Sequence, residues 1–154
     1  ALELDDGQVL TEGPAIVQYL ADLAPASGLA PANGTFERVR LQEALNYITA
    51  EIHKAYSPLF KPDVLAAVRE ERLAYLKRRY ALVEKQLEGR QYLFGDRFTV
   101  ADAYLYAVTR WARGVKLDLS GFPNLNAFQE RVSSRKAVRE ALAEEGLLPA
   151  SKAA

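Results

Sequence analysis

Two groups of residues in this sequence have types and spacings suited to binding or activating a small molecule. The first is the turn Thr11-Glu12-Gly13, which follows an apolar pair and precedes a helical pattern. Free backbone N–H groups at a helix start bind anions, Gly13 lets a ligand approach the backbone, and the Glu12 carboxylate can accept hydrogen bonds from an ammonium. The turn is therefore suited to the zwitterionic end of an amino acid, with an ordinary capped turn as the alternative.

The second group is a polar helix face. Asn46, Ala50, His53 and Lys54 stand at i, i+4, i+7 and i+8, beside a separate apolar stripe. The small Ala50 leaves room for a ligand, the His53 imidazole can donate to an oxyanion or a sulfur, and the Lys54 ammonium can attract a carboxylate. The alternative is a polar face that is simply solvated.

Aromatic side chains near these residues can provide an apolar surface. The set is Tyr56, Phe60, Tyr104, Tyr106 and Trp111. Such rings line pockets for apolar ligands, although each ring alone is equally compatible with core packing.

A third motif predicts structure rather than chemistry. Thr99 followed by Asp102 has the spacing of a helix N-terminal capping box, and Phe98 before it can pack over the first turn. We therefore assign Thr99 and Asp102 a structural function.

The composition excludes several classes of function. The chain has 154 residues, 20 basic and 20 acidic side chains, no Cys and one His. A net charge of zero argues against a nucleic-acid partner, and the absence of Cys with a single His argues against a metal site. No apolar run is long enough for a membrane span and no signal peptide is visible, so we expect no membrane partner and a cytoplasmic location.

The elements that must position these residues are mostly helical. An Asp-Gly turn between short apolar runs predicts a β-hairpin over residues 1–10. Breaker residues at 27–34 predict a linker. Apolar spacing and capping signals predict helices over about 13–24, 35–56 and 63–87, and further helices starting near Thr99, Asn124 and Lys136.

The hairpin has no other strands to pair with, and the chain starts with Ala1 rather than Met. Because two strands alone are marginally stable, we expect a preceding segment of the same folded unit. The expected organisation is a domain remnant at 1–26, a linker at 27–34 and an all-helical domain at 35–154.

Three segments in this order resemble the bacterial beta class of glutathione transferases. They are LTEGPAIVQYLAD (10–22), LNYITAEIHKAYSPLF (45–60) and FTVADAYLYAVTRW (98–111). The resemblance implies a mostly α fold: the family's C-terminal helical bundle, preceded by a β-hairpin and helix that are the remnant of its thioredoxin-like domain. It also implies that the family's active-site Cys and first strands lie upstream of Ala1.

The resemblance implies the transfer of glutathione, a co-substrate, to hydrophobic electrophiles in detoxification, with thiol–disulfide exchange as a second reaction. His53 would support catalysis by helping to set the protonation of the sulfur. The glutathione-binding residues would be Glu12, Gly13, Asn46, His53 and Lys54. The hydrophobic-substrate residues would be Tyr56, Phe60, Tyr104 and Trp111. It implies no metal and a homodimer.

One departure from the family is Gly13, where many relatives carry Ser, so a hydroxyl contact to glutathione is lost. Because half of a site positions its ligand poorly, we expect the chain alone to bind glutathione more weakly than about millimolar and to show no turnover. The alternative is a non-catalytic helical module of the same fold that serves protein association.

Overall fold

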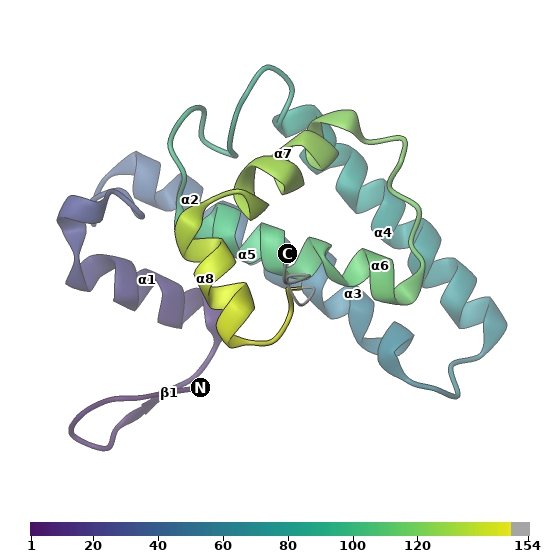
Figure 1. The fold of residues 1–154 in the computed structure, drawn as a ribbon, viewed down its shortest axis with the longest axis horizontal. Coiled ribbons are helices and arrows are strands. Elements are labelled where there is room, and N and C mark those ends of the chain that lie inside the picture. Colours follow the sequence, from purple (N-terminus) through teal and green to yellow (C-terminus); the bar gives the residue numbers. More distant parts are fainter. Residues whose placement is uncertain (149–154) are drawn as a thin grey trace, which may run out of the picture.

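In the computed structural model, residues 1–148 of the chain are described. Figure 1 shows a bundle of helices with a small hairpin at the N-terminal end. The main elements are β1 (Leu2–Glu3), β2 (Val9–Leu10), α1 (Gly13–Leu23), α2 (Phe36–Tyr47), α3 (Lys54–Tyr56), α4 (Ala66–Gln86), α5 (Val100–Thr109), α6 (Trp111–Val115), α7 (Pro123–Ser133) and α8 (Lys136–Glu144). The prediction of a mostly helical fold with an N-terminal hairpin is confirmed.

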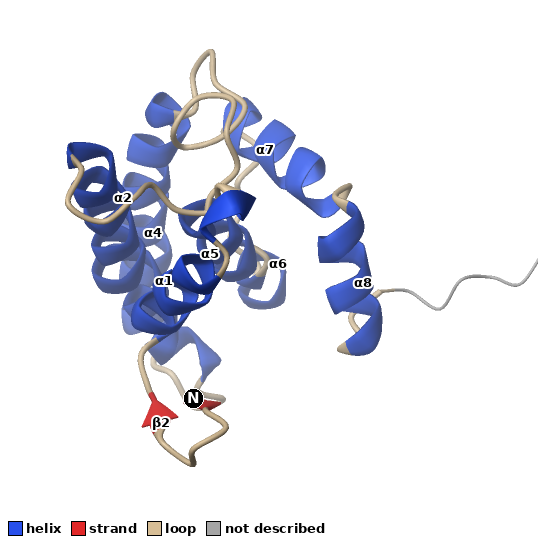
Figure 2. Cartoon of the chain, turned by 90° about the vertical axis from the view of Figure 1, so that its left-hand side faces the viewer, coloured by secondary structure: helices blue, strands red, loops and turns tan. Residues whose placement is uncertain are grey.

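The hairpin has the predicted antiparallel pairing, with Leu2 opposite Leu10. Its turn places Gly7 at a φ of 82°, a conformation that favours glycine. Figures 1 and 2 show the hairpin extending away from the helices. It therefore contributes little to the core and instead leads the chain to the start of α1.

Helix α5 lies at the centre of the bundle and packs against α1, α2, α6 and α7. Its apolar residues join one continuous core with those of the long helix α4. Leu76, Tyr80 and Val83 of α4 are buried, as is Leu87 directly after the helix. This packing fixes α5 beside the helix that carries His53.

The predicted long helix over 35–56 is present but not uniform. Helix α2 runs into a π-helical segment, Ile48–His53, and then into α3. A π-helix has a wider turn than an α-helix, so it changes which residues share a face. This segment begins two residues after Asn46, ends at His53 and was not predicted.

The predicted linker is held in place by Arg38. Its guanidinium donates to both carboxylate oxygens of Asp22 at 2.8 and 2.7 Å, to the Gln18 side chain at 3.2 Å and to the Pro31 carbonyl at 2.9 Å. Arg38 is only 4% exposed. One buried cation thus joins α1, the connecting segment and α2, although the division into domains remains a prediction.

Helix α7 has no capping side chain of its own. Glu84 of α4 instead accepts hydrogen bonds from the backbone N–H groups of Asn124 and Leu125 at 3.0 and 2.8 Å. Helix α8 follows and packs against α7, on the side of the molecule opposite α2 in Figure 2. Across residues 1–148, no helix combines the length and apolar character that crossing a membrane requires.

Candidate functional site

The turn before α1 has an unusual backbone. Glu12 lies at a φ of 66°, a region that non-glycine residues seldom occupy, and its carbonyl accepts hydrogen bonds from Ala15 and Ile16. Such strain is of order 1–3 kcal/mol and is concentrated at functional sites. Gly13 is exposed and has open space where a side chain would stand. A ligand therefore has free access to the backbone here.

His53, the last residue of the π-helical segment, forms a close pair with Tyr104 of α5. Its Nδ1 lies 2.6 Å from the Tyr104 hydroxyl, and both side chains are half-buried. Burial, and to a lesser extent the neighbouring Lys54 ammonium, lower the pKa of His53, with a smaller opposing effect of the Glu12 carboxylate. His53 is therefore predominantly neutral at pH 7.

Burial also raises the pKa of the Tyr104 hydroxyl, the hydrogen bond from Thr49 opposes the rise, and the Glu12 carboxylate adds a smaller increase. Since Glu12 acts on both His53 and Tyr104, the turn before α1 lies within electrostatic range of the pair. The structure thus brings Glu12, His53 and Tyr104 to one region from three elements.

An aromatic cluster adjoins this pair. The Trp111 ring meets His53 edge-on with centroids 4.8 Å apart, and Phe60 meets Trp111 at 5.4 Å. Phe60 is 55% exposed and Trp111 is half-buried, so they present apolar surface next to the imidazole. This arrangement fits an apolar ligand group placed beside a polar one.

Tyr56 differs from the other predicted residues of the apolar site. Its side chain is 0% exposed, and its hydroxyl lies 2.9 Å from that of Tyr80. The ring meets Trp111 from the core side at 5.6 Å. Tyr56 therefore supports the cluster from within and does not line an open surface in this conformation.

The remaining predicted glutathione residues are less closely associated. Lys54 is exposed and follows His53 directly. Asn46 is exposed in α2 and is separated from His53 by the π-helical segment. The shared face expected for Asn46 and His53 assumed a regular α-helix, so the assignment of Asn46 to the site stays a prediction without further support.

The predicted capping box is present at the start of α5. The Asp102 carboxylate is 0% exposed and accepts from the backbone N–H groups of Leu93 and Thr99 and from the Thr99 hydroxyl, each at 2.8 Å. Burial raises the pKa of Asp102, and these hydrogen bonds oppose the rise. The geometry accounts for the buried carboxylate through backbone donors alone.

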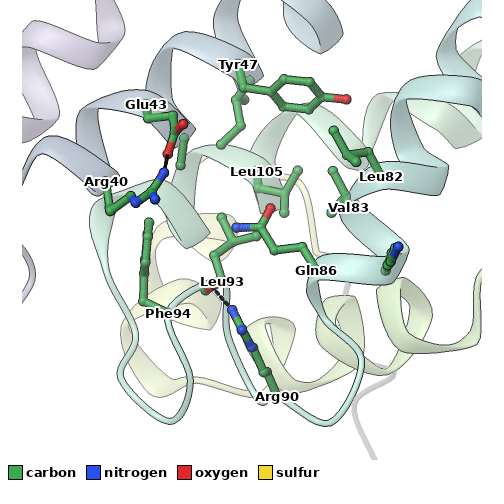
Figure 3. A pocket seen from close by; sticks show the side chains of 13 residues that line it. Arg40, Glu43, Tyr47, Leu82, Val83, Gln86, Arg90, Leu93, Phe94 and Leu105 are labelled. Atoms are coloured by element: carbon green, nitrogen blue, oxygen red, sulfur yellow. Dashed lines mark hydrogen bonds and ion pairs between the residues drawn. The ribbon is translucent and has the colours of Figure 1, made fainter. Parts of the chain in front are cut away.

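A groove of about 700 Å³ lies elsewhere, between α2, α4 and the loop that follows α4 (Figure 3). Its walls are mostly apolar, and its rim carries the Arg40–Glu43 ion pair at 2.7 Å and Arg90. None of the predicted site residues line it. The groove is therefore separate from the His53 region.

Sequence reasoning missed Thr49, whose hydroxyl lies 3.4 Å from that of Tyr104 and donates to the Leu45 carbonyl at 2.8 Å. No local pattern marked this contact, because it joins residues 55 positions apart in the sequence. Among residues 1–148, no three acidic, histidine or cysteine side chains gather as a metal site would require.

Comparisons with known proteins give the family. Residues 47–136 match the description "Glutathione S-transferase, C-terminal domain". Glutathione S-transferase GstA of Escherichia coli O157:H7 is 44% identical over 147 residues, which cover 96% of this chain and 73% of that protein.

Solved structures agree with this. A ternary complex of BphK, a bacterial GST, shares a TM-score of 0.93 and 52% identity over 95% of this chain and 73% of that one. The bacterial beta-class glutathione S-transferase of Sphingomonas chungbukensis has a TM-score of 0.91 and 39% identity. The match covers 96% of this chain and 73% of that one. A sphingomonad glutathione S-transferase complexed with glutathione has a TM-score of 0.90 and 42% identity. The match covers 96% of this chain and 73% of that one.

The chain belongs to the glutathione S-transferase family. Its similarity to beta-class structures confirms the resemblance seen in the sequence.

Proposed function

We propose that His53, Tyr104, Phe60 and Trp111 form the sulfur-facing and electrophile-facing part of a glutathione transferase site. In the proposed reaction, the thiolate of glutathione attacks an electrophilic carbon, a C–S bond forms, and the leaving group departs with its electron pair. The observation that carries the proposal is the edge-on contact of His53 with Trp111 at 4.8 Å. It joins a hydrogen-bonding group to an apolar surface, as the two substrates require.

Glu12 and Gly13 are proposed to bind the γ-glutamyl end of glutathione. The Glu12 carboxylate would accept from the ammonium, and the N–H groups at the start of α1 would bind the carboxylate. The open space at Gly13 and the electrostatic effect of Glu12 on His53 support this placement. Lys54 adds a positive charge near the anionic sulfur.

The relatives favour an enzyme over a non-catalytic association module. GstA and the protein GST-4.5 of Xanthomonas campestris, 34% identical, are both named as glutathione S-transferases. Glutathione as the co-substrate is supported by the sphingomonad structure, which is a glutathione complex. We propose a hydrophobic electrophile as the second substrate because Phe60 and Trp111 offer an exposed aromatic surface.

Binding is tested on the full-length protein, because the chain alone is expected to bind glutathione only weakly. Calorimetric titration with S-hexylglutathione is expected to saturate. Replacing Phe60 by Ala should weaken binding about tenfold, which is about 1.4 kcal/mol of lost apolar contact. Phe36→Ala, at an exposed ring on α2, is the matched control and should leave the affinity unchanged.

Activity is tested on the full-length protein with glutathione and a chromogenic aryl halide. His53→Ala should lower kcat more than it raises KM for the halide, because the imidazole acts on the sulfur. A titration without saturation, or equal effects of Phe60→Ala and Phe36→Ala, would count against the proposed site.

A further inference from the structure

A polar hollow of about 650 Å³ lies between the segment that follows α1 and the loop that joins α4 to α5. Its walls come from residues 26–29, from residues 91–98 and from Arg135 at the start of α8. It shares no lining residue with the groove of Figure 3, and none of the residues assigned to the transferase site lines it. The hollow is therefore a second and independent candidate site.

Backbone hydrogen bonds hold the walls of the hollow in place. Tyr92 and Gly95 exchange N–H···O bonds of 2.8 and 3.1 Å across the turn of the loop. The N–H of Val100 donates to the Leu29 carbonyl at 2.9 Å, which joins the end of the loop to the segment after α1. Because this backbone is already ordered, a ligand bound here loses little affinity to the ordering of loops.

Arg135 is oriented by aromatic rings. Its guanidinium carbon lies 4.0 Å from the centroid of the Phe98 ring, and its Nη1 donates to the Tyr92 hydroxyl at 3.3 Å. The two rings meet edge-on with centroids 5.5 Å apart. A guanidinium stacked on a ring keeps its N–H edge available for a planar, two-pronged contact with an anion. The Arg135 donors are thus positioned before any ligand binds.

The positive charge around the hollow has no carboxylate partner. Arg97 and Arg135 both line it, and the Arg131 guanidinium lies 6.0 Å from the Tyr92 ring centroid. Among residues 1–148, none of these three arginines forms an ion pair. Asp96 also lines the hollow, so its single negative charge stands against several positive ones. An anion would supply the missing charge.

The hollow also offers hydroxyl donors. The Tyr92 hydroxyl accepts from Arg135, and the Ser27 hydroxyl accepts from the Leu29 N–H at 3.3 Å, so each retains its own proton to donate. Helix α8 starts directly after Arg135 without a capping side chain, which places the positive end of its dipole here. These groups together favour a ligand with several anionic oxygens.

We propose that this hollow binds the phosphate group of a small phosphate ester, with Arg135 as its anchor and Arg97, Tyr92 and Ser27 as further donors. A phosphate group presents three oxygens in different directions, so it can accept from a guanidinium and from the hydroxyls of other elements at once. A carboxylate has two oxygens in one plane. The volume of about 650 Å³ leaves room for the rest of the ester.

An NMR titration of the full-length protein with glycerol 3-phosphate tests the proposal at pH 8, where the phosphate is a dianion. The ionic strength is held constant, and the buffer contains no phosphate or sulfate. We expect saturable shifts of backbone amide resonances in residues 26–29 and 91–98. Sodium phosphate should bind no more tightly than the ester, and sodium acetate should bind at least about tenfold more weakly.

Two substitutions with opposite expected effects sharpen the test. Arg135→Gln should weaken binding of glycerol 3-phosphate at least about tenfold, because it removes the stacked guanidinium. Arg139→Gln, at an exposed arginine on the same helix, is the matched control and should leave the affinity unchanged. Asp96→Asn should tighten binding, because it removes the carboxylate that repels the anion.

Equal weakening by Arg135→Gln and Arg139→Gln would reveal only a general attraction of anions to basic surface and would overturn the site. Acetate that binds as tightly as the ester, tighter binding of inorganic phosphate, or an unchanged affinity in Asp96→Asn would each contradict the proposed ligand. Circular dichroism shows whether Arg135→Gln is folded; if it is not, the acetate comparison and Asp96→Asn decide. Glutathione conjugation by Asp96→Asn should remain at the unsubstituted rate, so this site and the transferase site can fail separately.

Discussion

Phenol groups near the site differ sharply in what they can do. Tyr56 and Tyr80 share a hydrogen bond inside the core, and burial raises the pKa of both, that of Tyr80 to about 12. Neither hydroxyl can ionise near pH 7. Tyr104, half-buried at the edge of the site, is the phenol whose proton meets a titratable partner. Of these three phenols, Tyr104 is therefore the one in contact with His53.

The lowered pKa of His53 gives a pH dependence of stability. In the unfolded chain His53 takes up a proton near pH 6.5, whereas in the folded chain the proton binds only at lower pH. The free energy of unfolding should therefore decrease as the pH falls through 6.5 toward the folded-state pKa, and this contribution should be constant above that window.

Urea unfolding at several pH values between 5 and 8 measures this effect. The control is His53→Gln, which cannot titrate. As the pH falls, the free energy of unfolding of the unsubstituted chain should decrease relative to that of His53→Gln. A constant difference over this range would contradict the lowered pKa.

At the scale of elements, the start of α5 depends on Asp102. Replacing it by Ala removes the acceptor of two buried N–H groups, at Leu93 and Thr99, and of the Thr99 hydroxyl. Loss of a cap costs about 0.5–2 kcal/mol, and each buried donor left unpaired adds to this. Asp102 bonds only to groups at Leu93 and Thr99. Its loss should therefore reduce the stability of the fold more than the activity of each folded molecule.

Thermal melting and yield of folded protein measure the loss. Thr99→Ala should be milder than Asp102→Ala, because the carboxylate still accepts from both backbone groups. If Asp102→Ala melted like the unsubstituted protein but had no turnover, the structural assignment of Asp102 would be wrong.

Glu84 makes the start of α7 dependent on α4. Its carboxylate accepts from two backbone N–H groups and from the Asn124 side chain. Glu84→Ala should reduce the free energy of unfolding by about 1.5–3 kcal/mol, the range for hydrogen bonds to a charged group. Denaturant unfolding tests this against Glu70→Ala, an exposed site on the same helix, which should change stability by less than about 0.5 kcal/mol.

Local signals predicted some elements well and missed others for a physical reason. The Asp-Gly turn and the Thr99–Asp102 spacing depend on neighbours in sequence, and both elements were confirmed. The cap from Glu84 acts over 40 residues, so no local pattern records it. The π-helical segment was missed because its residues fit an α-helical stripe equally well.

The same distinction applies to the site. The sequence identified His53 and the aromatic residues by type and spacing, but the pairing of His53 with Tyr104 spans 51 residues and needed the packing of α5. The aromatic side chain of Tyr56 suggested a place in the substrate site, but its ring is buried in the core. Side-chain type indicates what a residue can do, whereas tertiary packing decides which surface it faces.

At the scale of the whole molecule, four consecutive residues of α2 lie in different environments. The sequence places Arg38, Val39, Arg40 and Leu41 on one helix. Arg38 is buried and paired with Asp22, and Leu41 is 0% exposed in the core. Of these four residues, only Val39 and Arg40 remain at the surface, and Arg40 lines the groove of Figure 3.

Leu82, which is 55% exposed, lines this groove, and α2 carries two further exposed apolar side chains, Phe36 at 66% and Val39 at 53%. A contiguous apolar surface is a frequent feature of association sites. The basic Arg40, Lys85 and Arg90 and the acidic Glu43 also line the groove, so a second copy offers charges of both signs. We propose this face as the contact of a two-fold homodimer, the commonest symmetric assembly.

Leu82→Glu should therefore shift the protein from dimer to monomer, because it places an unpaired charge in the apolar contact. Light scattering at micromolar concentration should give twice the mass of the chain for the unsubstituted protein and its single mass for the variant. Leu65→Glu is the control: Leu65 is 72% exposed but lies about 25 Å away along α4, so the dimer should persist. A monomeric unsubstituted protein would contradict the dimer, and dissociation by both substitutions would place the contact elsewhere.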